Sequence, residues 1–149
     1  MKKIFTVAFI VCTSVSYSQT VELSGLFTKN YNSFEASAGY YLKGTTALGI
    51  NAGVLAIPEY PLAIPVTVRV IAGTNNIFAN LQAGYLYFTK EKDKTIYQID
   101  NTGGLYIKIG ALIQFTKLPS FYFDANLVSY QINKASQTGG SLSVGYRFK

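Results

Sequence analysis

The chain has 149 residues, of which 49% are hydrophobic, 15% aromatic and only 13% charged, and its formal net charge is +6. It contains no histidine and a single cysteine, which excludes a Ser-His-Asp triad and a zinc site built from His and Cys ligands. We therefore expect one domain that is not an enzyme and that holds neither a metal nor a cofactor. The basic residues do not gather on one face, and the sequence contains no known fold motif of nucleic-acid-binding proteins, so we do not expect nucleic-acid binding.

The N-terminal segment, residues 1–18, has the pattern of a secretory signal peptide. Two lysines precede a short apolar run, Ile4–Cys12, and small residues end the segment at Ser18. We predict cleavage before Gln19, which leaves residues 19–149 as the mature domain. The apolar run is too short to cross a bilayer as a helix. A lipoprotein acylated at Cys12 stays open as an alternative, although Val11 stands where such signals carry a small residue.

From Val21 onward the chain repeats one unit, a segment with strict alternation of apolar and small polar residues. Such alternation predicts a β-strand with two different faces. The polar face carries Gly, Ser, Asn, Gln and single charges, whereas the other face is apolar with aromatic residues near its ends, which is typical of transmembrane barrel strands. The segments are 21–28, 34–42, 46–56, 62–73, 77–89, 104–116, 121–131 and 140–148. The sequence therefore predicts an all-β fold, an eight-stranded antiparallel up-and-down transmembrane β-barrel.

The connections between these segments are predicted to alternate in length. Short turns follow the second, fourth and sixth strands, the last of them at 117–120, and longer polar loops follow the first, third, fifth and seventh, the last at 133–139. This arrangement places both termini in the periplasm and the longer loops outside the cell. Pro65 is awkward within the fourth strand, so we expect that strand to begin late or to carry a bulge.

The pattern resembles that of the small eight-stranded outer-membrane barrels of Gram-negative bacteria, of the OmpA/OmpX transmembrane-domain type. The resemblance covers Val21 to Phe148 and is strongest in the last strand, where Leu142, Val144, Tyr146 and Phe148 alternate. It implies an outer-membrane location and an assembly signal, at Tyr146 and Phe148, that the barrel-assembly machinery reads. The chain departs from the family pattern in one respect, because Lys149 follows the terminal aromatic.

Charged residues on the predicted inner face are expected to form a luminal network, because an isolated buried charge costs several kcal/mol. Three are acids and three are bases, and Glu22 could pair with Arg147 near the periplasmic end. The predicted luminal set is Glu22, Glu35, Arg69, Lys108, Asp124 and Arg147.

Aromatic residues near the strand ends are expected to form two girdles at the membrane interfaces. The predicted girdle residues are Phe27, Phe34, Tyr85, Tyr87 and Tyr130 toward the outer loops, and Tyr40, Phe115, Phe121 and Phe123, with Tyr146 and Phe148, toward the periplasm. The longest polar stretch carries three lysines, Lys90, Lys92 and Lys94, which would face the outside as a solvated loop or as a contact for lipopolysaccharide phosphates.

Three functions follow from these predictions. The first is a structural or surface-interaction protein of the outer membrane, a monomer with a lumen filled by its own side chains and with any activity in its outer loops. The second is a narrow pore or a transporter of small ligands, which several inner-face glycines would favour by leaving space. The third is a soluble lipocalin-like binding barrel, which would need an apolar interior and a charged exterior, the reverse of the predicted faces.

Overall fold

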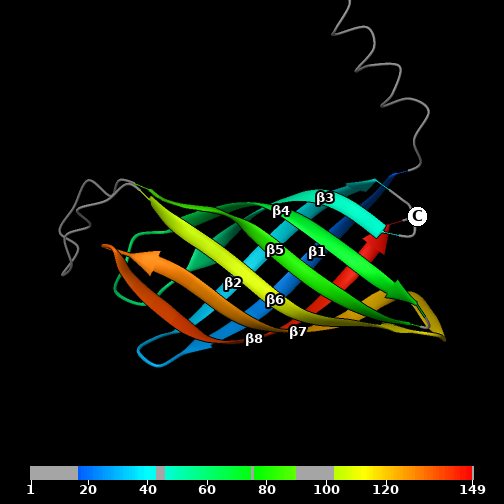
Figure 1. Cartoon of the computed structure of the whole chain (residues 1–149). Coiled ribbons are helices and arrows are strands. Elements are labelled where there is room, and N and C mark those ends of the chain that lie inside the picture. Colours follow the sequence, from blue (N-terminus) through cyan, green and yellow to red (C-terminus); the bar gives the residue numbers. More distant parts are fainter. Residues whose placement is uncertain (1–16, 43–45, 75, 90–102, 149) are drawn as a thin grey trace, which may run out of the picture.

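The chain folds into a closed antiparallel β-barrel of eight strands in a computed structural model that describes residues 17–42, 46–74, 76–89 and 103–148 (Figure 1). Each strand pairs with its neighbours in sequence, and β1 pairs with β8 to close the sheet. In the part of the chain so described, no helix is long and apolar enough to span a bilayer. The strands are β1 (Tyr17–Thr28), β2 (Asn32–Leu42), β3 (Thr46–Ala56), β4 (Ala63–Thr74), β5 (Ile77–Phe88), β6 (Gly103–Phe115), β7 (Leu118–Ile132) and β8 (Ala135–Phe148).

The closing seam lies between the two strands that are farthest apart in the sequence. Its paired residues run from Gln19 and Phe148 at one end to Thr28 and Gly139 at the other. Tyr17 and Ser18, which the predicted cleavage would remove, pair with β2 alone. The seam with β8 therefore begins at Gln19, the predicted first residue of the mature chain. Residues 1–16 of the predicted signal peptide, and Cys12 with them, lie outside the described residues, so the cleavage stays a prediction.

The barrel has two distinct ends. We call the end at which β1 begins and β2, β4, β6 and β8 end the terminal end. The opposite end, at which β1, β3, β5 and β7 end, is the loop end (Figure 1).

Several connections are shorter than the sequence predicts. The connection β1–β2 has three residues rather than five, because β2 begins at Asn32. The expected polar loop at 133–139 is a two-residue turn, because β8 begins at Ala135. Asn133 and Lys134 have φ values of 50° and 66°, and two positive φ angles fit the type I′ turn that matches the twist of a hairpin. The turn after β6 is likewise shorter than predicted, because β7 begins at Leu118, and a register shift next to Phe115 accommodates it. The predicted alternation of short turns and long loops therefore fails after β7.

Pro65 lies inside β4. The strand therefore does not begin after this proline, and it carries no bulge there. Pairing between β3 and β4 passes from Ala52 and Val66 directly to Leu55 and Ala63, with the register unchanged. Proline has no N–H to donate, so the ladder with β3 is interrupted opposite Gly53. On its other side Pro65 still pairs with Leu86 of β5.

The two faces of the sheet separate as the alternation predicts. Apolar side chains of every strand are exposed on the outside of the barrel, among them Leu23, Ile50 and Leu127, which are 57%, 62% and 67% exposed. Polar and charged side chains of the same strands are buried inside, including Glu22, Arg69 and Lys108. A soluble protein rarely exposes a continuous apolar surface of this kind, whereas a barrel surrounded by lipid requires it.

Candidate functional site

The chemistry of this chain is concentrated in the lumen, where a polar layer lies between two apolar clusters. The layer consists of inward-facing residues from the middle of the strands, all of them almost completely buried. Because alternate residues of a strand share a face, each strand contributes at least one polar side chain to it. Its members are Glu22, Ser24, Glu35, Asn51, Thr67, Arg69, Asn80, Gln82, Lys108, Asp124, Asn126, Ser141 and Ser143.

Arg69 of β4 is the centre of this layer. Its Nη1 lies 2.7 Å from Oε2 of Glu22 on β1, and its Nη2 pairs with Oδ2 of Asp124 on β7. Its Nε donates to Oδ1 of Asn80 on β5 at 2.7 Å. A planar guanidinium with donors on separate edges can serve three acceptors at once. One fully buried side chain therefore joins four strands across the lumen.

The carboxylates that hold Arg69 are themselves held by neutral donors. Tyr122 donates its hydroxyl to Oε2 of Glu22 at 3.0 Å, and Ser24 donates to Oε1 of the same residue at 3.3 Å. Asn80 donates from Nδ2 to Asp124 at 2.9 Å. Such support matters because a buried ion pair offsets its desolvation only when its remaining lone pairs are also satisfied. The lumen therefore replaces most of the hydrogen bonds that these charges lose on leaving water, and within the described residues only Oδ1 of Asp124 in this cluster is without a hydrogen-bond partner.

A second ion pair lies nearer the loop end. Nζ of Lys108 on β6 lies 2.8 Å from Oε2 of Glu35 on β2, and Tyr106 donates its hydroxyl to the same oxygen at 2.5 Å. The ammonium also lies 5.7 Å from the centre of the Tyr106 ring, within range of a cation–π interaction. This pair crosses the barrel between strands that are not neighbours.

Apolar residues fill the lumen on the loop-end side of the polar layer. Tyr31 and Tyr60, which belong to the connections β1–β2 and β3–β4, pack against this cluster and join their hydroxyls at 3.0 Å. Their rings meet edge to face with centroids 5.3 Å apart. We call this group the loop-end plug, and its buried members are Leu26, Leu55, Ile57, Ala63, Leu86, Tyr106, Val128, Tyr130 and Ile132.

A smaller group, the terminal-end plug, consists of Tyr41, Ile71, Leu112 and Tyr122, with Ala47 and Phe78 packed against it. Its two tyrosines occupy the space over inner-face glycines. A Cβ at Gly49 would lie 2.2 Å from Cδ1 of Tyr41, and one at Gly145 would lie 2.0 Å from Cζ of Tyr122. These glycines therefore do not leave the lumen open, as the pore hypothesis supposed, because they make room for the tyrosine rings.

Five of the six predicted luminal charges lie in the buried polar layer, and Arg147 does not. Arg147 is only partly buried, and the described ion pairs of Glu22 involve Arg69 rather than Arg147. The expected Glu22–Arg147 pair is therefore wrong. Alternation places Arg147 on the inward-facing side of β8, but it does not determine how deeply a side chain is buried. Arg147 precedes the last residue of β8, at the terminal end. The buried layer is left with three carboxylates and two cations.

One predicted girdle residue is in the wrong place. Tyr130 is completely buried in the loop-end plug, where its ring stacks with that of Tyr106 at 6.3 Å. It has the same parity in β7 as Tyr122 and Asp124, so the alternation itself places it inside. The sequence clue was present and was missed.

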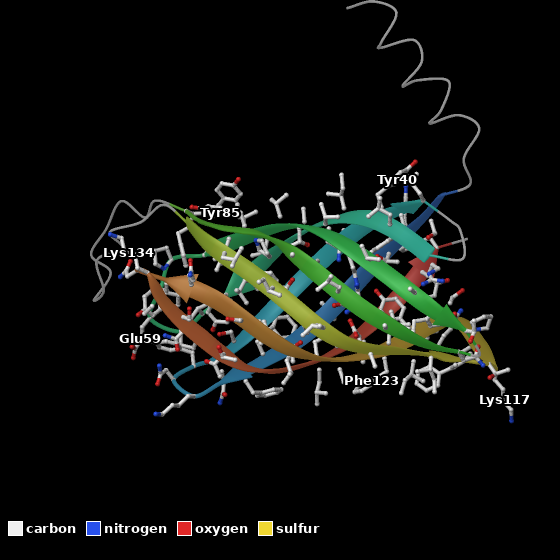
Figure 2. All side chains as sticks on the ribbon, viewed as in Figure 1. Tyr40, Glu59, Tyr85, Lys117, Phe123 and Lys134 are labelled. Carbon is white, nitrogen blue, oxygen red and sulfur yellow. The ribbon has the colours of Figure 1, made fainter. Side chains whose placement is uncertain are left out.

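The other predicted girdle aromatics lie on the outside of the barrel. Tyr85 and Tyr40 project outward along the upper edge of the view, toward opposite ends of the barrel, and Phe123 projects from the lower edge (Figure 2). Tyr146 contacts both Phe121 and Phe148, with ring centroids 4.9 Å apart in each pair. Exposed members include Phe27, Phe34, Tyr85 and Tyr87 at the loop end and Tyr40, Phe115, Phe121 and Phe148 at the terminal end. The predicted loop lysines Lys90, Lys92 and Lys94 lie outside the described residues.

Several neutral members of the polar layer were not singled out from the sequence. Tyr41 donates to Asn51 at 2.5 Å, and Gln82 donates to Thr67 at 2.7 Å. Their alternation with apolar residues marks them as inward-facing, which was the available signal. Among the described residues, no group of three or more His, Cys, Asp or Glu side chains could hold a metal ion.

This barrel resembles several solved structures. The N-terminal β-barrel domain of Pseudomonas aeruginosa OprF aligns with a TM-score of 0.58 and 18% identity over 88% of this chain and 97% of that one. A de novo designed transmembrane β-barrel aligns with a TM-score of 0.56 and 15% identity, over 88% and 95% of the two chains. The Yersinia pestis outer membrane protein Ail aligns with a TM-score of 0.55 and 15% identity, over 91% and 100%.

At these identities the likeness establishes the fold and not an activity. No protein-family model matches the sequence, and no curated protein matches it. The chain has the fold of the small eight-stranded outer-membrane β-barrels, so the fold class predicted from the sequence is confirmed.

Proposed function

We propose that this chain is an integral protein of the bacterial outer membrane, in which a closed barrel serves as a rigid scaffold and the loop end carries any contacts with partners. The apolar outer face and the two bands of exposed aromatics support a membrane location. The same outer face disfavours the lipocalin-like alternative, which requires a surface that water can solvate. The proposal assigns the chain no catalytic activity and no cofactor, and it treats the barrel as a monomer.

The closed lumen is the part of the proposal that excludes transport. A single observation carries it, namely that the wholly buried guanidinium of Arg69 is held from β1, β5 and β7 at once. An eight-stranded barrel has an interior just wide enough for its own side chains. With the two plugs on either side of the Arg69 cluster, a solute would have to break buried ion pairs and displace tyrosine rings.

Conductance in a planar bilayer tests the closed lumen against the pore alternative. We expect no steady single-channel current from the refolded wild-type barrel. The neutralising substitution Lys117→Gln, at the exposed turn after β6, serves as a control that leaves the lumen unchanged. Steady currents in the wild type that are lost in Lys108→Gln, and kept in Lys117→Gln, would refute the scaffold proposal and support a pore.

A charge introduced on the outer face tests the membrane location. Leu23→Arg places a cation among exposed apolar residues in the middle of β1, and we expect it to destabilise the lipid-refolded barrel by about 2–4 kcal/mol. Ser136→Arg introduces the same side chain at an exposed position of β8 beyond the seam with β1, and it should change stability by less than about 1 kcal/mol. Urea unfolding in lipid vesicles measures both. Equal effects, or a monodisperse folded monomer in buffer without lipid, would contradict the membrane location.

Under this proposal, lipid headgroups and the cell exterior surround the loop end of the barrel. Lys134 at the tip of the β7–β8 hairpin lies at this end together with Glu59 (Figure 2), and Lys29 is exposed in the β1–β2 connection. Cationic side chains at this level suit the phosphates of lipopolysaccharide. At the other end, the exposed Phe148 and its neighbour Tyr146 are the proposed signal for the barrel-assembly machinery.

A further inference from the structure

We propose that a hollow on the outer face of β6, β7 and β8 holds an acyl chain of a phosphorylated glycolipid of the outer leaflet, with Lys29 contacting its phosphate. This inference rests on the proposed function, because it requires the outer face to meet lipid. It goes further by naming the place and the chemistry of the lipid. The argument has three steps, which concern the shape of the hollow, its open floor and its polar rim.

The hollow exists because small residues meet on neighbouring strands. Ala111 of β6 pairs with Ala125 of β7, and Gly140 of β8 lies between Leu127 of β7 and Phe27 of β1. Larger apolar side chains surround this floor. The residues that line the hollow are Phe27, Ile109, Gly110, Ala111, Ala125, Asn126, Leu127, Gly140, Ser141 and Leu142. Its volume is about 600 Å³, and it forms an apolar trough on the outer face. The outer face carries further hollows of about 510 and 340 Å³, but both are lined by Tyr40 and lie toward the terminal end.

The floor of the hollow at Gly140 is open, unlike the space over Gly25 on the outer face of β1. A Cβ at Gly140 would meet a single atom within 4 Å, the carbonyl oxygen of Asn126 at 3.9 Å. By contrast, a Cβ at Gly25 would lie 3.1 Å from Cζ of the Phe27 ring. The space over Gly140 is therefore available to a flexible chain from outside the protein.

The rim of the hollow toward the loop end is polar and positively charged. Lys29 follows Phe27 by two residues and is exposed. Ser129 and Thr138, two residues beyond Leu127 and Gly140 on β7 and β8, face each other with hydroxyl oxygens 3.4 Å apart. Asn30 donates to Gln137 at 2.8 Å and so fixes the β1–β2 connection against β8. An apolar trough that ends in hydroxyls and an exposed cation is complementary to an amphiphile with an anionic head.

The polar rim favours a glycolipid over a phospholipid. Hydroxyl and amide side chains on the rim can exchange hydrogen bonds with sugar hydroxyls, while Lys29 supplies the charge that a phosphate attracts. The rim also lies at the loop end, which faces the outer leaflet under the proposed topology. A phosphorylated disaccharide that carries acyl chains, as in lipid A, joins these features in one molecule.

Native mass spectrometry of the mature chain in detergent, titrated with bisphosphorylated lipid A, tests the inference. Gly140→Leu fills the trough from its open floor, and Ala36→Leu adds the same side chain on the outer face of β2 as its control. Lys29→Glu reverses the charge of the rim, and Lys117→Glu makes the same change at the other end of the barrel. We expect wild type and both controls to retain lipid A equally, and both test variants to lose about five-fold in affinity or more.

Circular dichroism confirms that each variant is folded, and Ala125→Leu replaces Gly140→Leu if that variant does not fold. Retention that is equal in the trough variants and in Ala36→Leu would overturn the proposed site. Phosphatidylglycerol retained as tightly as lipid A would overturn the glycolipid assignment, and dephosphorylated lipid A retained as tightly would overturn the role of Lys29. Failure of the wild type to fold in detergent or lipid would instead refute the proposed function.

Discussion

Arg69 and Lys108 are both fully buried cations in the same lumen, yet their surroundings differ. Arg69 donates to Glu22, Asp124 and Asn80 from three different nitrogens. Lys108 forms one ion pair, with Glu35, and within the described residues its Nζ makes no contact with the geometry of a hydrogen bond. The second oxygen of Glu35 is likewise without a hydrogen-bond partner there. A guanidinium can join several strands through N–H donors on separate edges, whereas the ammonium on its flexible side chain pairs here with a single carboxylate.

Removing the Arg69 side-chain charge should have the largest effect. Arg69→Met leaves Glu22 and Asp124 buried without their shared cation, and we expect a loss of about 3–5 kcal/mol in the free energy of unfolding. Arg147→Met removes the same charge from a partly buried position outside the ion pairs, and it should change stability by less than about 1 kcal/mol. Urea unfolding of the lipid-refolded barrel measures both. Similar losses in the two variants would mean that the Arg69 cluster does not hold the strands together.

Removing the Lys108 charge should cost less, about 2–3 kcal/mol, because a single carboxylate is left unpaired. The double variant Lys108→Met/Glu35→Gln removes both charges and should recover most of that loss. No such rescue is expected for Arg69→Met combined with Glu22→Gln, since Asp124 stays unpaired. A double-mutant cycle in the same urea assay gives the coupling energies. A full rescue at Arg69 would remove the distinction between the two clusters.

Two tyrosine hydroxyls provide the smallest and sharpest comparison. Tyr106→Phe removes the neutral donor that Glu35 has among the described residues, whereas Tyr122→Phe leaves Glu22 with Arg69 and Ser24. Both changes delete a hydrogen bond to a charged group, and we expect a loss of about 1–2 kcal/mol for each, with the larger loss at Tyr106. Unfolding in lipid at matched protein concentration resolves the order. A larger loss of stability in Tyr122→Phe would show that the remaining donors to Glu22, Arg69 and Ser24, do not compensate for the lost hydrogen bond.

The fold was predictable from the sequence because one physical rule governs every strand. A residue faces either lipid or the lumen, and alternate positions share a face. The inward direction of Glu22, Glu35, Arg69, Lys108 and Asp124 follows from that rule alone. Tyr130 obeys it as well: it lies near the end of its strand, as a girdle residue would, but its parity places it in the lumen.

The partners within the lumen were not predictable in the same way. Lys108 and Glu35 come from β6 and β2, which do not pair, so their meeting depends on strand tilt and side-chain length. The depth of Arg147 depends on where the barrel ends, which alternation does not record. The tight turn at Asn133 and Lys134 was missed because neither residue is glycine, although asparagine tolerates a positive φ better than most residues.

The Arg69 cluster also bears on the order in which the barrel assembles. Its two carboxylate partners come from β1 and β7, near the two ends of the chain, while the arginine itself comes from β4. Strands two to six can pair in hairpins, and so form the Arg69–Asn80 hydrogen bond between β4 and β5, without completing either ion pair. The guanidinium reaches both carboxylates only when the first and last parts of the sheet curve toward each other. Closure of the β1–β8 seam and neutralisation of Arg69 are therefore one cooperative step, and a chain stalled before closure would hold an unpaired charge inside the membrane.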